Sequence, residues 1–257
     1  MVTSGNSLQT LEIVLSSQMY NKEKFKAFLV ESNEKKGVMD VDLDTLDEGD
    51  VLIKVSYSSF NYKDGLAITG KTPILKKFPM IPGVDFCGTV IESQNNLFKS
   101  GDKVILNGWG VGEKHTGGFS QIARVNSEWL INLPKKISEK DSMIIGSAGY
   151  TAALCVMVIQ NKIKPNDGEI LVTGASGGVG SIAVNLLYRL GYKVVALSNK
   201  NESYLKKLGA KSVLNRKDYS DIRLTLDRKD DLNFLNQIYK SLNNSCTWRE
   251  IINFLKK

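Results

Sequence analysis

The chain has 257 residues, a formal net charge of +7 and a hydrophobic content of 42%, which is the composition of a globular protein with room for one large domain or two small ones. Its 34 basic residues are scattered, without the basic stripe and interleaved aromatics of a nucleic-acid interface, so we expect anionic small molecules and no nucleic acid as ligands. The three cysteines, Cys87, Cys155 and Cys246, form no CxxC pair, which argues against a disulfide framework or a zinc knuckle.

The first part of the sequence lacks the basic segment and apolar core of a signal peptide. The longest apolar stretch, residues 144–159, is short for a membrane span and is interrupted by Gly146, Ser147, Gly149 and Tyr150. We therefore expect a cytoplasmic protein with no membrane partner.

The first half of the chain is predicted to be rich in β-structure. Short runs of β-branched and aromatic residues bounded by turn residues are typical of strands. They lie at Phe25–Val30, Val51–Tyr57, Gly88–Ile91 and Lys103–Leu106. Ser138 followed by Asp141 then resembles a capping box, which indicates that a helix begins there.

The second half alternates between strands and helices. Strands are predicted at Glu169–Thr173, Tyr192–Leu197 and Ser212–Leu214, and helices at Val179–Leu190 and Glu202–Leu208. This βαβαβ order is typical of a parallel α/β sheet. After residue 221 the alternation stops, and amphipathic helices are expected at Lys229–Leu242 and after Thr247. We therefore expect an extension at 1–18, a β-rich domain at 19–142, a partial dinucleotide-binding domain at 143–220 and a helical tail at 221–257.

A glycine-rich segment, Gly174-Ala-Ser-Gly177-Gly178-Val-Gly180, connects a predicted strand to a predicted helix. Glycine lets the backbone approach a pyrophosphate, and the helix N-terminus supplies free N–H groups and a positive dipole. The sequence therefore predicts a dinucleotide site, with a tight turn that binds no ligand as the alternative.

The end of the next strand bears on which dinucleotide binds. Ser198, Asn199 and Lys200 stand there, and no carboxylate precedes Glu202, so the pattern favours the 2′-phosphate of NADP(H) over the ribose of NAD. Arg216, just after the third strand, adds a second cation. The alternative is that Lys200 is only a solvated loop residue.

Other dehydrogenase and hydrolase patterns fit poorly. No Tyr-xxx-Lys pair follows the glycines, as the short-chain dehydrogenases require. His115 is the single histidine, and Pro82-Gly-Val-Asp85 stands where zinc alcohol dehydrogenases have Gly-His-Glu, so a catalytic zinc with three protein ligands is not expected. No Gly-x-Ser-x-Gly elbow of a serine hydrolase is present.

Five motifs stand along the chain: Asn61–Gly70, Phe78–Gly83, Gly108–Gly112, Met143–Gly146 and Val172–Gly180. Together they resemble one family, the acrylyl-CoA reductase branch of the zinc-free, quinone oxidoreductase-like medium-chain dehydrogenases/reductases. The resemblance covers residues 23–219. It implies an α/β fold with a GroES-like β-rich domain, a truncated Rossmann dinucleotide-binding domain and a short helical tail. The active site of the family lies between the first two.

The resemblance also implies roles for individual residues. Tyr62 would contact the nicotinamide end of NADPH and position it or assist proton transfer; the alternative is a packing role. Asn61, Asp64, Lys63 and His115 are lesser catalytic candidates. The pyrophosphate would be held by Ser176, Gly177, Gly178 and Val179, and the 2′-phosphate by Ser198, Asn199, Lys200 and Arg216. The implied reaction is NADPH-dependent reduction of the C=C bond of acrylyl-CoA or a related short enoyl-CoA.

The tail departs from the family pattern. Residues 221–257 faintly resemble the C-terminal end of sugar-nucleotide cytidylyltransferases, around Ile222–Asp227. A half-built sheet leaves an apolar strand edge, which favours association into a homo-oligomer. The alternative hypothesis is therefore a non-catalytic mosaic, or a vestigial reductase, that acts as a binding or interaction module.

The missing ligand set around Asp85 generates a first prediction. The purified protein should contain no stoichiometric metal, because three protein ligands are not available for a catalytic zinc. Elemental analysis checks this, and about one zinc per chain would contradict it.

Overall fold

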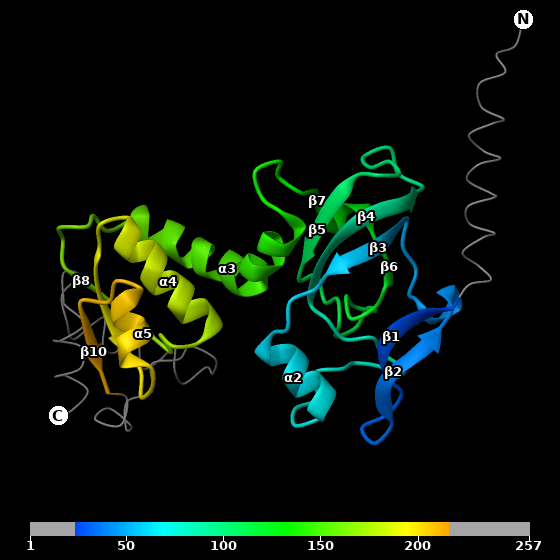
Figure 1. Cartoon of the computed structure of the whole chain (residues 1–257), viewed down its shortest axis with the longest axis horizontal. Coiled ribbons are helices and arrows are strands. Elements are labelled where there is room, and N and C mark those ends of the chain that lie inside the picture. The colour runs from blue at the N-terminus through cyan, green and yellow to red at the C-terminus, as the bar shows by residue number, and fades with distance from the viewer. Residues whose placement is uncertain (1–23, 216–257) are drawn as a thin grey trace, which may run out of the picture. The chain divides into compact units, whose positions relative to one another are not determined.

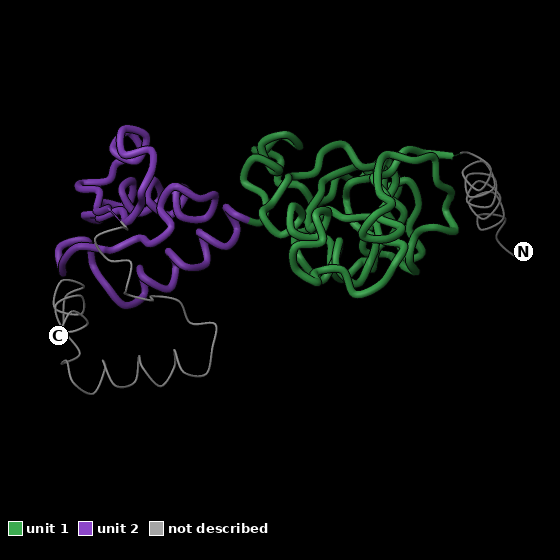
Figure 2. The backbone as a smooth tube through the Cα atoms, turned by 90° about the horizontal axis from the view of Figure 1, so that it is seen from below, with its two compact units in different colours: residues 1–147 green, residues 148–257 purple. Residues whose placement is uncertain are grey.

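The computed structural model describes residues 24–215, which form two compact units divided between Ser147 and Ala148 (Figure 2). The sequence placed this change of architecture a few residues earlier, between 142 and 143. The expected extension at 1–18 and tail at 221–257 lie outside the described residues, as do Cys246 and Arg216. The extents of the four expected segments therefore stay predictions.

The first unit contains a five-stranded antiparallel sheet and a separate β-hairpin (Figure 1). Strand β1 (Phe25–Val30) pairs with β2 (Lys36–Val41) to form the hairpin. The sheet has the order β6-β3-β4-β5-β7. Its strands are β3 (Val51–Tyr57), β4 (Asp85–Ser93), β5 (Lys103–Asn107), β6 (Ile122–Val125) and β7 (Leu130–Asn132). The four predicted strands are confirmed, and β4 is longer than predicted at both ends.

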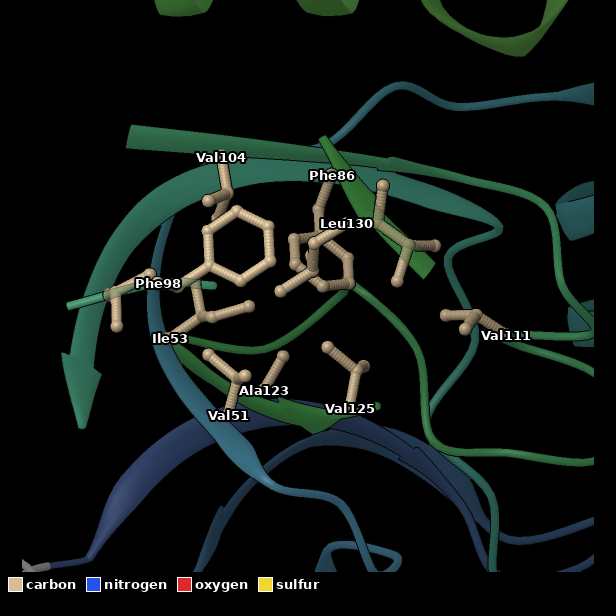
Figure 3. Close-up of a cluster of buried hydrophobic side chains, with 11 residues drawn as sticks. Val51, Ile53, Phe86, Phe98, Val104, Val111, Ala123, Val125 and Leu130 are labelled. Atoms are coloured by element: carbon tan, nitrogen blue, oxygen red, sulfur yellow. The ribbon is translucent and has the colours of Figure 1, made fainter. Parts of the chain in front are cut away.

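Alternating side chains of these strands build the core of the first unit (Figure 3). Val51 and Ile53 on β3 are fully buried, as are Val104 on β5 and Val125 on β6, because every second residue of a strand points to the same face. Phe86 contributes its ring to the centre of the cluster and is also fully buried. This core fixes the start of β4, where Asp85 lies.

Helix α3 (Glu139–Gln160) begins as the capping pattern predicts. Ser138 Oγ accepts the Asp141 N–H at 3.0 Å and donates to Asp141 Oδ2 at 2.6 Å. The helix is broken at Gly146, whose φ of 50° and ψ of −161° are not helical. Such a φ favours glycine, so the break is encoded by that residue.

Among the described residues, α3 is the one helix long and apolar enough to cross a membrane by length and composition. The part after the break, 147–160, is about 20 Å long at 1.5 Å per residue, against about 30 Å of hydrocarbon. Ala152 and Val156 are buried in the core of the second unit. Of the apolar 18-residue window of α3, 33% is buried.

The described part of the second unit has a three-stranded parallel sheet of order β10-β9-β8, accompanied by the later part of α3 and two further helices. Its elements are β8 (Glu169–Thr173), α4 (Gly178–Arg189), β9 (Lys193–Leu197), α5 (Glu202–Lys207) and β10 (Ser212–Leu214), which confirm the predicted order. Gly191, with a φ of 86°, follows the end of α4, and Gly209, with a φ of 105°, follows α5. Val184 and Leu187 of α4 pack on Val194 and Ala196 of β9 in one buried cluster.

Strand β8 forms one edge of this sheet among the residues that the structure describes. Because its second edge has no strand there, we expect its amides to open more readily than those of the five-stranded sheet. Hydrogen exchange on a monomeric sample should show faster exchange in residues 169–214 than in 51–106. Equal protection in a monomer would show that a further segment of the chain completes the sheet.

Candidate functional site

The first turn of helix α2 (Tyr62–Thr69) carries the predicted catalytic residues. Asn61 is its N-cap, and Asp64 Oδ2 accepts the Asn61 N–H at 2.8 Å, the reach-back bond of a capping box. Gly70, with a φ of 68°, ends the helix. The side chain of Tyr62 at the first helical position is 84% exposed. The sequence therefore builds a short, capped helix that presents Tyr62 to solvent.

Asp64 lies on the inner side of this turn and is 1% exposed. Its Oδ1 accepts the N–H groups of Gly83 and Val84 at 3.2 and 3.1 Å. Burial raises the pKa of Asp64 above its usual value, and the charge of nearby Asp85 raises it further, although the backbone N–H donors oppose both. Asp64 therefore ties α2 to the segment before β4 and does not face solvent.

Asp85 is fully buried at the start of β4. It accepts the Ser59 N–H at 3.0 Å, the Ser59 hydroxyl at 2.7 Å, the Asn61 Nδ2 at 3.3 Å and the Ser147 N–H at 2.8 Å. A Cβ at Gly146 would lie 2.8 Å from Ser59 Oγ and 3.2 Å from Asp85 Oδ2, so the break in α3 requires glycine. The structure thus brings Asn61 and Asp64 together around a carboxylate that sequence reasoning had noted only as a replaced zinc ligand.

The two lesser candidates point to other partners: His115 lies in a loop of the first unit, and Lys63 lies on α2 between Tyr62 and Asp64. The ring nitrogens of His115 lie 3.1 Å from Thr116 O and 3.0 Å from Glu48 O, so the ring is fixed by backbone carbonyls. Lys63 forms an ion pair with Glu113. Neither side chain forms a hydrogen bond to Asn61, Asp64 or Asp85 in the part of the chain that the structure describes.

The glycine-rich loop of the second unit closes tightly onto α4. Gly174 has a φ of 58°, and a Cβ at Gly180 would lie 2.3 Å from Gly174 O. No acidic residue stands in the first turn of α4, whose N-cap is Gly177. A bare, uncharged helix N-terminus with room for a close approach fits the pyrophosphate of a dinucleotide.

The predicted residues Ser176 and Ser198 lie together beside this loop, with their hydroxyl oxygens 2.9 Å apart. Ser198 Oγ donates to Lys200 O at 2.9 Å and accepts the Lys200 N–H at 3.2 Å. Asn199 and Lys200 are exposed on the same turn. Hydroxyl, amide and ammonium groups therefore gather where a 2′-phosphate would be recognised.

Two cavities border the described residues. One of about 500 Å³ lies in the second unit against Gly174 and Gly177–Gly180, with apolar walls from α3, β8 and α4. The other, of about 320 Å³, lies in the first unit between Glu48, Glu92 and Arg124, and no predicted site residue lines it. No group of three His, Cys, Asp or Glu side chains within residues 24–215 has the arrangement of a metal site.

Comparisons with known proteins cover both units. Residues 47–135 match the alcohol dehydrogenase GroES-like domain, and residues 170–238 match the NAD dependent epimerase/dehydratase family. The chain is 51% identical over 204 residues to a probable acrylyl-CoA reductase of Escherichia coli K12, and 42% identical over 205 residues to the acrylyl-CoA reductase of Ruegeria pomeroyi. The chain is therefore similar to acrylyl-CoA reductases among the medium-chain dehydrogenases/reductases. The predicted GroES-like and Rossmann-type fold class is confirmed for the described residues.

Solved structures show the same similarity. The YhdH protein of E. coli K-12 with bound NADPH has 50% identity and a TM-score of 0.74, and covers 79% of this chain. The YhfP protein of Bacillus subtilis with bound NAD has 43% identity and a TM-score of 0.71. The two acrylyl-CoA reductases each match 77% of this chain. In turn, the chain spans 63% of the E. coli reductase, 62% of the R. pomeroyi reductase and 64% of YhdH.

The turn after β9 generates a prediction about the cofactor. Changing Lys200 to Glu should reverse or abolish a preference for NADPH over NADH, because a charge contact with phosphate is worth about ten- to a hundredfold in affinity. Fluorescence titration with each dinucleotide measures the ratio. Lys193→Glu makes the same charge change at the opposite end of β9 and should leave the ratio as it is. An unchanged ratio in Lys200→Glu would contradict the assignment.

Proposed function

We propose that this chain is a zinc-independent, NADPH-dependent oxidoreductase that reduces the C=C bond of acrylyl-CoA or a related short enoyl-CoA. The observation that carries the proposal is the glycine loop, which closes on the uncharged N-terminus of α4 beside the Ser176–Ser198 pair. The 51% identity to the E. coli relative and the NADPH bound in YhdH support the substrate class and the cofactor.

The second unit would hold the cofactor through its backbone and small side chains. Ser176, Gly177, Gly178 and Val179 would bind the pyrophosphate at the start of α4. The turn formed by Ser198, Asn199 and Lys200 would bind the 2′-phosphate, with Arg216 as a further cation. When bound there, NADPH supplies the hydride that reduces the C=C bond.

The first unit would supply the groups around the reacting thioester. Reduction places negative charge on the thioester oxygen and requires a proton at the α-carbon. Tyr62 is our candidate for positioning the nicotinamide or assisting that proton transfer, because its hydroxyl lies on an exposed ring at the N-terminus of α2. Asn61 and Asp64 would act by position, since Asp64 is buried and Asn61 Nδ2 contacts Ser59 and Asp85.

The alternative function is a dinucleotide-binding or interaction module without turnover, which the edge position of β8 favours. Titration with NADPH, followed by an assay with acrylyl-CoA, separates the two. Saturable NADPH binding with turnover supports the reductase, and binding without turnover supports the module. A CoA thioester as the small-molecule partner, assembly into a homo-oligomer and a cytoplasmic location are part of the proposal.

A matched pair of variants tests the role of Tyr62. Tyr62→Phe keeps the ring and removes the hydroxyl, so a role in proton transfer predicts a loss in kcat of about a hundredfold or more with little change in the Kd for NADPH. Tyr62→Ala should also weaken NADPH binding if the ring positions the nicotinamide. Steady-state kinetics and fluorescence titration measure both. A Tyr62→Phe variant with normal kcat would show that the hydroxyl has no part in the reaction.

A further inference from the structure

The loop after β5 holds a tryptophan in an unusual conformation. Trp109 has a φ of 58°, in the left-handed region that favours glycine, yet its side chain is 59% exposed. The Gly108 N–H donates to Val84 O at 2.9 Å, and the N–H groups of Val111 and Lys114 close turns within the loop at 3.0 Å each. A large apolar ring that is both exposed and held in a strained conformation indicates a functional role.

A second aromatic ring supports Trp109 from behind. The rings of Trp109 and Trp129 are stacked, with centroids 6.3 Å apart and planes 12° from parallel. Trp129 packs against the core of the first unit, and its ring lies nearly perpendicular to that of His115, with centroids 5.1 Å apart. The ring of His115 is itself fixed by the carbonyls of Glu48 and Thr116. Trp109 is therefore an exposed ring that is supported by a chain of ring contacts leading back to the core.

Lysines gather around Glu113, in the same loop as Trp109. Lys114 is exposed, and its side chain lies over Gly110, where an added Cβ would meet Lys114 Cε at 2.6 Å. Glu113 forms an ion pair with Lys63, and the charges of Lys76 and Lys114 also act on its carboxyl group. Three lysines near one glutamate leave this surface positively charged, and the Lys63 contact joins it to helix α2.

We propose that Trp109, supported by Trp129, and Lys114 bind the adenine nucleotide end of the CoA thioester. The inference rests on the proposed function for its substrate. In a short enoyl-CoA, adenine is the one aromatic ring and the nucleotide carries all the phosphates, whereas the pantetheine arm is neutral. An adenine ring stacks on an exposed indole, and phosphates are attracted to lysine. The adenine nucleotide of NADPH is assigned to the second unit.

Adenosine 3′,5′-bisphosphate, the nucleotide end of CoA, is the direct probe. Isothermal titration calorimetry of the full chain saturated with NADP⁺ should show binding that Trp109→Ala weakens about tenfold or more. Ile131→Ala is the matched control, because Ile131 is also 59% exposed in the same unit. Lys114→Glu changes an exposed side chain and should weaken binding as well. The proposal is overturned if the bisphosphate does not bind, or if neither Trp109→Ala nor Lys114→Glu weakens its binding.

Kinetics distinguish the CoA thioester from a free nucleotide as the source of this chemistry. Trp109→Ala should raise the KM for acrylyl-CoA and leave both its kcat and the KM for acrylyl-pantetheine unchanged. Equal effects on the two thioesters overturn the assignment to CoA. The titration needs no turnover: if the bisphosphate binds in a Trp109-dependent manner but acrylyl-CoA is not reduced, the binding surface stands and the proposed reductase activity fails.

Discussion

The buried carboxylate of Asp85 is the constraint on which the candidate site of the first unit depends. An ionised carboxylate out of contact with water is costly unless donors surround it, and here Ser59, Asn61 and Ser147 supply them. Each donor belongs to a different feature: the loop after β3, the N-cap of α2 and the break in α3. Removing the carboxylate would take away the acceptor that the three features share, so they are fixed together.

Asp64 extends this arrangement at an electrostatic cost. Its pKa is raised by burial and then by the charge of Asp85, so the folded state disfavours the ionised form. Asp64 therefore stabilises the fold below its unfolded pKa, and this contribution is lost as the pH rises through the higher folded pKa. At neutral pH the role of Asp64 is to fix positions. Its carboxyl group accepts the Asn61 N–H on one side and the Gly83 and Val84 N–H groups on the other.

The parts that sequence reasoning predicted are those encoded locally. Strands β1, β3 and β5 carry β-branched or aromatic runs, and the glycine loop is contiguous with the helix that it starts. Strands β6 and β7 are too short to show a period, and β2 has polar or small residues at several positions, so none of them was predicted. Helix α2 was missed because Gly65 and two β-branched residues, Ile68 and Thr69, conceal a helix that its caps stabilise. The partners of Asp85 lie 24 to 62 residues away in the chain, a distance that no local pattern spans.

The proposed sites of the two units are therefore built from different chemical groups. The proposed dinucleotide loop of the second unit would use backbone N–H groups, and its shape depends on the absence of a side chain at Gly180. Such a site can be predicted from glycines spaced between a strand and a helix. The site of the first unit uses side-chain carboxylates whose donors come from three separate segments, and its meaning emerges only when the chain is folded. In the sequence, Asp85 stands where zinc alcohol dehydrogenases have a zinc-ligand motif. In the structure, the same residue is the acceptor that organises the helix carrying Tyr62.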